Sequence, residues 1–194
     1  MILQTDITLF YHYKRVLLQA ATTNDKPMKA TVLAALLLAY CILAACTRSS
    51  PNAQLVQADS LMQKFPDSAL YFLEKIRPEE LNSLEDRAYY ALLVTQVQDK
   101  NYIFQENDSL IRIAVQYYDS IKSTSMQAKA HYYWGCIWRN REIYPQALGR
   151  FFTAISYAQK ASDHKLTGYI YNNIANLYFL QKLYEQADSI YQIT

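Results

Sequence analysis

The chain has 194 residues and a formal net charge of +2, with 3 glycines, 5 prolines and 18 tyrosines. Gly and Pro together make up about 4% of the residues, against roughly 12% in average proteins, which excludes the many tight turns of a β-sandwich or barrel. Because Gly135, Gly149 and Gly168 stand singly, a Gly-rich phosphate loop is also excluded. The composition therefore predicts an all-α chain of long helices with short polar connections.

An uncharged, largely apolar run covers residues 30–47 and directly follows Lys29. A basic residue before an apolar run is the pattern of an export signal. The run would also fit a retained transmembrane anchor, since 18 residues of helix span about 27 Å, or a buried core helix. Because an export signal normally begins at its own methionine, we predict that residues 1–27 are an upstream extension and that residues 28–45 are the signal peptide.

The apolar run ends in Leu43-Ala-Ala-Cys46, which resembles the lipobox of bacterial lipoproteins. This resemblance implies that Cys46 becomes the lipidated N-terminus, that residues 46–52 form a tether, and that the protein is anchored in the bacterial cell envelope by its lipid. The acidic run that resembles a surface-export signal in Bacteroidetes is absent after Cys46, and Thr47 is not the aspartate that retains some lipoproteins in the inner membrane. We therefore expect an outer-membrane location facing the periplasm.

Two degenerate helix pairs are expected over residues 53–123. The first pair comprises residues 55–65, whose apolar positions recur at helical spacing, and residues 66–76, which begin with a proline. The second pair begins near Ala88 and continues with a helix over residues 110–118, for which residues 107–109 offer good N-cap side chains.

A 40-residue repeat relates residues 131–152 to residues 171–192, with Tyr144-x-Gln-Ala147 aligned on Tyr184-x-Gln-Ala187. Bulky residues one helical turn apart predict two helices per copy. The small residues Gly135 and Ala147 would allow these helices to approach closely. Thr124-x-x-Gln127 is predicted to be a capping box, and Pro145 is placed to open the second helix of its pair.

This arrangement resembles the tetratricopeptide repeat, and the resemblance implies a right-handed α-solenoid of about four antiparallel helix pairs. Residues 124–194 would then hold two repeats, the last one incomplete. The repeat exceeds the family's 34 residues by six, which we place in the connection 160–165. His131 departs from the usually larger first position of the motif. The residues at motif positions are Trp134, Gly135, Trp138, Ala147, Phe151, Ala154, Ile174, Ala175, Tyr178, Ala187 and Tyr191.

The combination of a lipobox and these helices is similar to tetratricopeptide lipoproteins of the Bacteroidetes. Many of those carry a transmembrane helix and a coiled coil or a DNA-binding domain after the repeats. We predict that this chain is truncated at its C-terminus, although a natural end that frays is the alternative. The DNA beyond codon 194 distinguishes the two. Truncation would leave four apolar side chains partly uncovered: Ile174, Leu177, Leu183 and Ile190.

In tetratricopeptide domains the first helix of each pair lines a concave groove. Lysine or arginine there would meet a carboxylate, and asparagine amides would hold the backbone of an extended peptide. Ordinary solvated surface is the alternative for these side chains. The predicted groove residues are Lys129, Tyr132, Cys136 and Arg139 in one repeat and Asn172, Asn176 and Phe179 in the next.

A catalytic constellation is absent from the sequence. The histidines His12, His131 and His164 are scattered, and His131 has no carboxylate or thiol three or four residues away. Cys136 is the only cysteine after Cys46 and is expected to be a buried small hydrophobe. Because the basic and acidic residues after position 45 balance, a nucleic-acid partner is not expected.

We therefore expect no enzyme activity, no metal and no cofactor. The predicted function is a lipid-anchored scaffold that binds a protein or peptide partner. The alternative is the sensory half of a transmembrane signalling or transcriptional regulator whose output domain follows the repeats.

Overall fold

The computed structural model describes residues 52–193, so the predicted upstream extension, signal peptide and lipidated Cys46 lie outside the described residues. Within residues 52–193 there are eight α-helices, one short 3-10 helix and no strand, which confirms the all-α class. None of these helices is long and apolar enough to cross a membrane.

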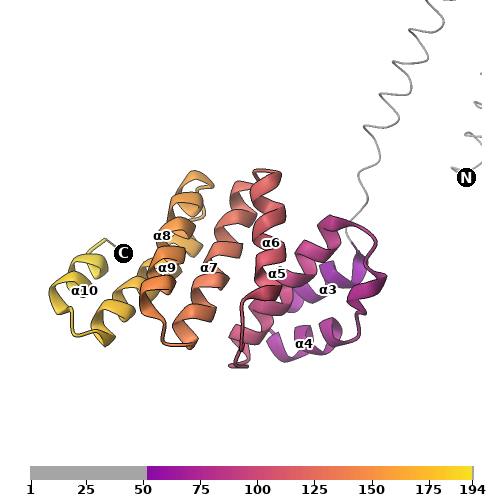
Figure 1. Cartoon of the computed structure of the whole chain (residues 1–194), viewed down its shortest axis with the longest axis horizontal. Helices are drawn as coiled ribbons and strands as arrows, with labels where there is room; N and C mark the ends of the chain where they lie inside the picture. Colours follow the sequence, from indigo (N-terminus) through magenta and orange to yellow (C-terminus); the bar gives the residue numbers. More distant parts are fainter. Residues whose placement is uncertain (1–51, 194) are drawn as a thin grey trace, which may run out of the picture. The chain divides into compact units, whose positions relative to one another are not determined.

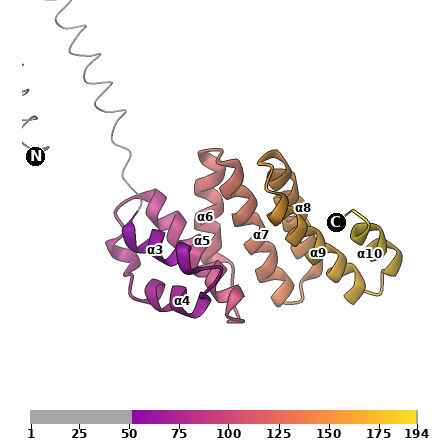
Figure 2. The ribbon, with the colours of Figure 1, turned by 180° about the vertical axis from the view of Figure 1, so that it is seen from behind.

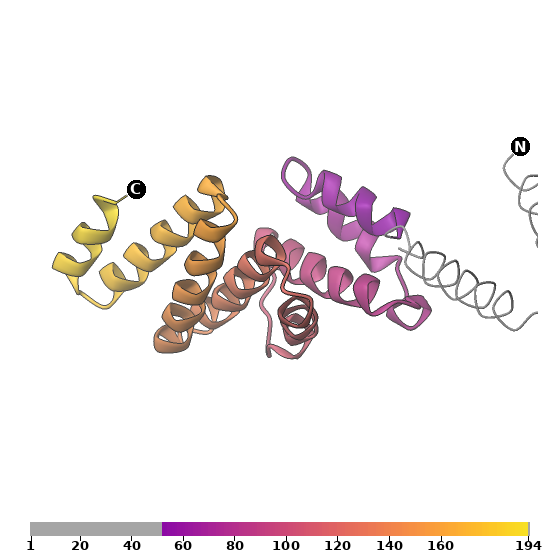
Figure 3. The ribbon, with the colours of Figure 1, turned by 90° about the horizontal axis from the view of Figure 1, so that it is seen from above.

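The helices follow one another in space in the same order as in the chain (Figure 1). Each packs against the next, and α3 also packs on α5, α5 on α7, and α7 on α9. The views from behind and from above show the same succession from α3 to α10 (Figures 2 and 3). The bounds are α3 Ala53–Leu61, α4 Pro66–Glu74, η1 Pro78–Glu80, α5 Leu84–Lys100, α6 Ser109–Ser120, α7 Thr124–Asn140, α8 Tyr144–Lys160, α9 His164–Leu180 and α10 Tyr184–Tyr191.

The second half of this array has a regular period. Helices α7, α8, α9 and α10 begin at residues 124, 144, 164 and 184, so one helix and its turn take 20 residues and a pair takes 40. The predicted insertion in the connection 160–165 is wrong. The turns 141–143 and 161–163 have the same length, and α7, α8 and α9 have 17 residues each. The extra length of the repeat therefore lies in the helices.

The turns repeat the same backbone device. Tyr102, Lys122, Glu142, Ser162 and Lys182 have positive φ angles between 54° and 62°, and they too stand 20 residues apart. After Glu142, the N–H of Ile143 donates to the carbonyl oxygen of Trp138 at 2.9 Å, which closes the helix as a Schellman motif. These turns are closed without glycine, which explains how a chain with only 3 glycines makes so many reversals.

We expect Glu142→Gly to raise the free energy of unfolding by about 1 kcal/mol, because glycine removes the steric cost of the left-handed conformation and offsets its own larger entropy loss. Glu142→Ala is the matched control, since alanine keeps a Cβ and should give no comparable gain. Urea denaturation of the full chain measures both variants. Equal stability of the glycine and alanine variants would show that the turn is not strained.

Side chains cap several helix starts. Ser83 accepts a hydrogen bond from the N–H of Asp86 at 2.9 Å, Asp163 accepts one from the N–H of Leu166 at 2.9 Å, and Pro145 lies in the first turn of α8, as predicted. The predicted capping box at Thr124 is wrong. Ser123, and not Thr124, is the residue before α7, and its side chain makes no capping bond. The Gln127 amide donates to Asp119 of α6 at 2.9 Å.

The core between the helices is built from small and large residues in contact. Gly135 of α7 lies against Phe151 of α8, and a Cβ at position 135 would come within 2.5 Å of the Phe151 ring. Among the residues at motif positions, Gly135, Ala147, Phe151, Ala154, Ile174, Ala175 and Ala187 are buried, Trp134, Trp138 and Tyr178 are half-buried, and Tyr191 is exposed.

The expectation that Ile174 and Leu177 would be partly uncovered is wrong, because α9 packs on α7, α8 and α10 and both side chains are fully buried. Leu183 is 39% exposed and Ile190 is half-buried, as expected.

Candidate ligand-binding groove

A groove of about 450 Å³ collects side chains from α3, α5, α7 and α9, together with the turns beside them. We call it the odd-helix groove. It extends over all four odd-numbered helices because each of them packs on the next odd-numbered one. Its lining residues are Asp59, Gln63, Gln96, Asp99, Lys100, Lys129, Tyr132, Tyr133, Asp163, Lys165, Leu166 and Tyr169.

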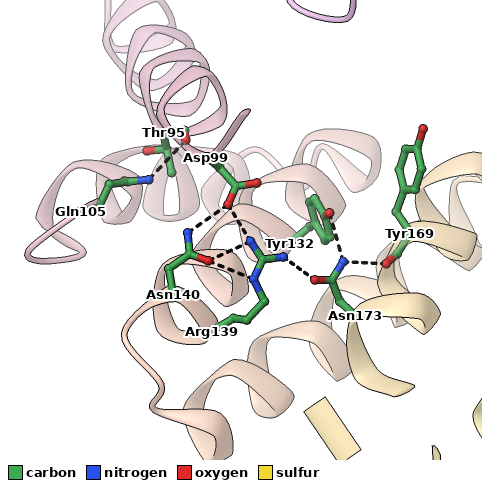
Figure 4. Close-up of polar contacts among 8 residues, drawn as sticks. All are labelled: Thr95, Asp99, Gln105, Tyr132, Arg139, Asn140, Tyr169 and Asn173. Carbon is green, nitrogen blue, oxygen red and sulfur yellow. Dashed lines mark hydrogen bonds and ion pairs between the residues drawn. The ribbon is translucent and has the colours of Figure 1, made fainter. Parts of the chain in front are cut away.

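A polar network joins three of these helices beside the groove (Figure 4). Arg139 of α7 donates to Asp99 of α5 at 2.8 Å and also to Asn173 of α9. The Asn173 amide donates in turn to the Tyr132 hydroxyl at 3.3 Å and to the Tyr169 carbonyl oxygen at 2.8 Å. Asn140 donates to the same Asp99 oxygen at 3.2 Å. The ion pair and the hydrogen bonds of this network therefore link α5, α7 and α9 to one another.

The electrostatics of this network follow from burial. Burial alone would lower the pKa of the Arg139 guanidinium, but the neighbouring Asp99 carboxylate raises it. Burial raises the pKa of the Cys136 thiol, and Asp99 adds to this effect. Arg139 is therefore held as a cation, and Cys136 as a neutral thiol at physiological pH.

The charges that line the groove differ in how they are engaged. Asp59 accepts a hydrogen bond from the Tyr89 hydroxyl at 2.6 Å, Asp99 is paired with Arg139, and Asp163 caps α9. Lys129 and Lys165, by contrast, make no hydrogen bond or ion pair within residues 52–193, although the Lys165 Nζ lies 5.9 Å from the centre of the Tyr169 ring. The carboxylates are thus engaged within the fold, while two lysines remain available to an anionic group.

The structure places the predicted groove residues in three different environments. Lys129 and Tyr132 line the odd-helix groove, Arg139 belongs to the polar network, and Cys136 is fully buried. The groove-facing interpretation of Cys136 is therefore wrong, whereas its interpretation as a buried hydrophobe is confirmed.

Asn172, Asn176 and Phe179 are exposed on α9 and do not line this groove. Phe179 contacts the ring of Tyr184 edge to face, with centroids 5.5 Å apart. Asn172 and Asn176 occupy the positions of Tyr132 and Cys136 one repeat earlier, where α9 covers α7. They are exposed because no helix in the described part of the chain covers α9 on that side.

Four groove or network residues were not predicted from the sequence: Asp99, Lys165, Tyr169 and Asn173. A signal was present for Tyr169, which stands 40 residues after Lys129 and is therefore at the equivalent position of the next repeat. Tyr169 is 49% exposed, so its ring is accessible to a ligand.

His131, at the first motif position, is buried between the rings of Trp134 and Tyr157, whose centroids lie 6.1 and 5.7 Å from its own. Its Nε2 lies 3.7 Å from a carboxylate oxygen of Asp119 on α6, and its Nδ1 has no hydrogen-bond partner within the described residues. Burial lowers the pKa of this imidazole, and the Arg150 guanidinium of α8 acts in the same direction, while the Asp119 carboxylate opposes both. The folded protein therefore favours the neutral imidazole.

A lowered pKa means that the unfolded chain binds a proton at His131 more readily than the folded chain. We therefore expect the free energy of unfolding to fall as the pH falls below about 6.5, the ordinary histidine value. Urea denaturation at pH 7.5 and 5.0 should show a smaller fall for His131→Phe than for the native sequence. His164→Gln, which changes an exposed histidine, should keep the native fall. The same pH dependence in His131→Phe would exclude this group as the cause.

No group of three or more His, Cys, Asp or Glu side chains that could hold a metal ion occurs in the part of the chain that the structure describes. Comparison with known proteins finds no matching family model, no similar curated protein and no similar solved structure.

Proposed function

We propose that this protein is a non-enzymatic scaffold of the tetratricopeptide type, a right-handed solenoid of four helix pairs that binds an extended peptide of a partner protein in the odd-helix groove. The 40-residue spacing of α7 and α9 supports the solenoid. So does the packing of each odd-numbered helix on the next. Repeats of this kind bury their faces against neighbours and leave one extended surface for binding.

The observation that carries the proposed binding is the imbalance between engaged carboxylates and unpaired lysines in the groove. Lys129 and Lys165 come from successive odd helices and line one cavity with Tyr132, Tyr133 and Tyr169. An aspartate, a glutamate or a terminal carboxylate of a peptide would pair with these lysines, and the Tyr169 ring, which is 49% exposed, would pack on its apolar side chains. The peptide is thus expected to be acidic and to carry apolar or aromatic residues.

A binding role suits the chemistry of the described residues better than catalysis does. The Cys136 thiol is fully buried and its pKa is raised, whereas a nucleophilic cysteine needs an accessible thiolate. The His131 imidazole is enclosed by aromatic rings and helix α6. Neither group reaches the odd-helix groove, where a substrate would bind.

The proposal is tested with a phage-displayed library of 12-residue peptides, selected on the purified full chain. Peptides that are enriched are synthesised, and their Kd is measured by fluorescence anisotropy. We expect acidic peptides, with Kd values at least tenfold higher for Lys129→Glu and Lys165→Glu. Lys160→Glu is the matched control, because Lys160 ends the even-numbered helix α8 and does not line the groove. Unchanged Kd values in both groove variants would refute this groove as the peptide site.

We further propose that the scaffold is a bacterial lipoprotein, anchored through a lipid on Cys46 and held at the outer membrane on its periplasmic side. The apolar run that ends in Leu43-Ala-Ala-Cys46 supports this. Cells fed an alkyne-labelled fatty acid should label the native chain and not Cys46→Ser. A labelled Cys46→Ser variant would contradict the anchor.

A further inference from the structure

A second groove, of about 690 Å³, lies between the η1 segment, the first half of α5 and one face of α6. We call it the α5–α6 groove. Its lining is mostly apolar and includes Leu81, Leu84, Tyr90, Leu110, Ile113 and Tyr117. Leu84 is 71% exposed and Ile113 is 46% exposed. It shares no lining residue with the odd-helix groove, so an inference about it does not rest on the function proposed above.

The α5–α6 groove exists because α4 is short. Two repeats before α8 (Tyr144–Lys160), the corresponding residues are 64–80, but α4 ends at Glu74, so it lacks the last six residues, or about 9 Å of helix. After Ile76 the chain turns into η1 instead of continuing along α5. The last two turns of the even-numbered helix are therefore missing from the first pair (Figure 1).

The next repeat shows which element covers the start of an odd-numbered helix. One repeat later, the end of α6 covers the start of α7, where Asp119 accepts a hydrogen bond from Gln127 at 2.9 Å and Ala130 is fully buried. The equivalent residues 40 positions earlier are Glu79, Arg87 and Tyr90. Glu79 and Arg87 are both exposed, and Tyr90 is only half-buried. In the next repeat, the start of the odd-numbered helix is thus covered by the last two turns of an α-helix, and these turns are absent over the start of α5.

The charges around the groove favour a basic occupant. Glu79 lines the groove, and Glu85 lies close enough to raise the pKa of the Tyr117 hydroxyl, after the larger effect of burial. Both carboxylates are exposed and lack an ion pair within residues 52–193. The one cation in the lining is Arg87, whose Nε donates to the Leu81 carbonyl oxygen at 2.7 Å. An apolar floor flanked by unpaired carboxylates is complementary to an apolar stripe flanked by lysine or arginine.

We propose that the α5–α6 groove binds a short basic amphipathic α-helix of a partner protein, which takes the place of the two missing turns of α4. Aliphatic side chains at positions i, i+3 or i+4, and i+7 of that helix would contact Leu84, Ile113 and Tyr117. Lysine or arginine beside this stripe would pair with Glu79 and Glu85. The full chain would then hold two partners, or two segments of one partner, at separate surfaces.

The test uses a labelled synthetic 14-residue helix of leucine and lysine with the apolar stripe on one face. Its comparison peptides are a scrambled sequence of the same composition and a leucine–glutamate helix. Fluorescence anisotropy with the full chain should show saturable binding of the leucine–lysine helix only. Ile113→Lys and Glu79→Lys should each raise its Kd at least tenfold. Both residues are exposed, so the far-UV circular dichroism should not change.

Phe152→Lys is the matched control, because Phe152 of α8 is 46% exposed, as Ile113 is, and lies outside this groove. It adds the same charge and should leave the Kd unchanged. Equal binding of the scrambled or the acidic peptide would overturn the proposal. So would equal weakening by Ile113→Lys and Phe152→Lys, or a weakening by Lys129→Glu as large as that by Ile113→Lys, since Lys129 lines the other groove.

Discussion

Replacing Phe151 with alanine is expected to lower the free energy of unfolding by about 3–5 kcal/mol, the usual cost of removing a buried aromatic ring. Phe151 is fully buried and its ring fills the space beside Gly135 and the ring of Tyr132, whose centroid lies 5.8 Å away. Alanine would leave a cavity at the contact between α7 and α8, which the surrounding backbone cannot close. Urea denaturation of the full chain, followed by circular dichroism at 222 nm, measures the loss.

Phe152→Ala is the internal control for this measurement. Phe152 is the next residue in the same helix and its side chain is 46% exposed, so its removal should change the stability by about 0.5 kcal/mol or less. Similar losses in the two variants would mean that helix propensity, rather than packing against α7, determines the effect.

Gly135→Ala is expected to destabilise the protein by about 1–2 kcal/mol, although alanine is favoured over glycine in a helix by about 1 kcal/mol. The new Cβ would lie 2.5 Å from one carbon of the Phe151 ring and 2.6 Å from another. Because Phe151 is fully buried, its ring has little freedom to withdraw. The strain of this contact should therefore exceed the gain in helix propensity.

Gly149→Ala is the same chemical change, but it is expected to raise the stability of the protein. A Cβ at Gly149, within α8, would have no other atom within 4 Å, so the helix propensity should act alone and raise the stability by about 1 kcal/mol. In a chain that already carries Phe151→Leu, Gly135→Ala should cost less stability than it does in the native chain, since leucine leaves more room at that contact. A stabilising Gly135→Ala would show that α7 and α8 adjust their spacing at low cost.

The period of the fold could be predicted from the sequence, because small and bulky residues repeat at one 40-residue spacing. Tyr144-x-Gln-Ala147 and Tyr184-x-Gln-Ala187 open α8 and α10 at the same register. Helix α6 was also predictable, because residues 107–109 mark its start, although the N-cap residue Asp108 makes no side-chain capping bond. The predicted capping box at Thr124 is absent, because Ser123 is the residue before α7 and the Gln127 amide donates to Asp119 on a different helix.

The groove was harder to predict because the direction of a side chain around its helix depends on which neighbour covers it. Cys136 was assigned to an open groove, but it is fully buried, and α9 lies against that side of α7. The Asp99–Arg139 pair shows the same difficulty. The two residues are 40 positions apart and hold equivalent positions in successive repeats. An alignment of the repeats therefore shows an acidic residue opposite a basic one, and does not show that the two are in contact. Opposite charges at equivalent positions are, however, what a direct contact between neighbouring repeats favours.

The packing of each helix mainly on helices one or two places along the chain has a consequence for how the protein opens. Because the stabilising contacts are between neighbouring helices, a helix at an end can unfold without the others. Such a helix is expected to exchange its amide protons before the helices in the middle. Helix α10, with 8 residues and Ala187 as its one buried residue, should exchange first. Helix α7 contacts α5, α6, α8 and α9 and should exchange last, so the network around Arg139 lies in the slowest part of the described chain.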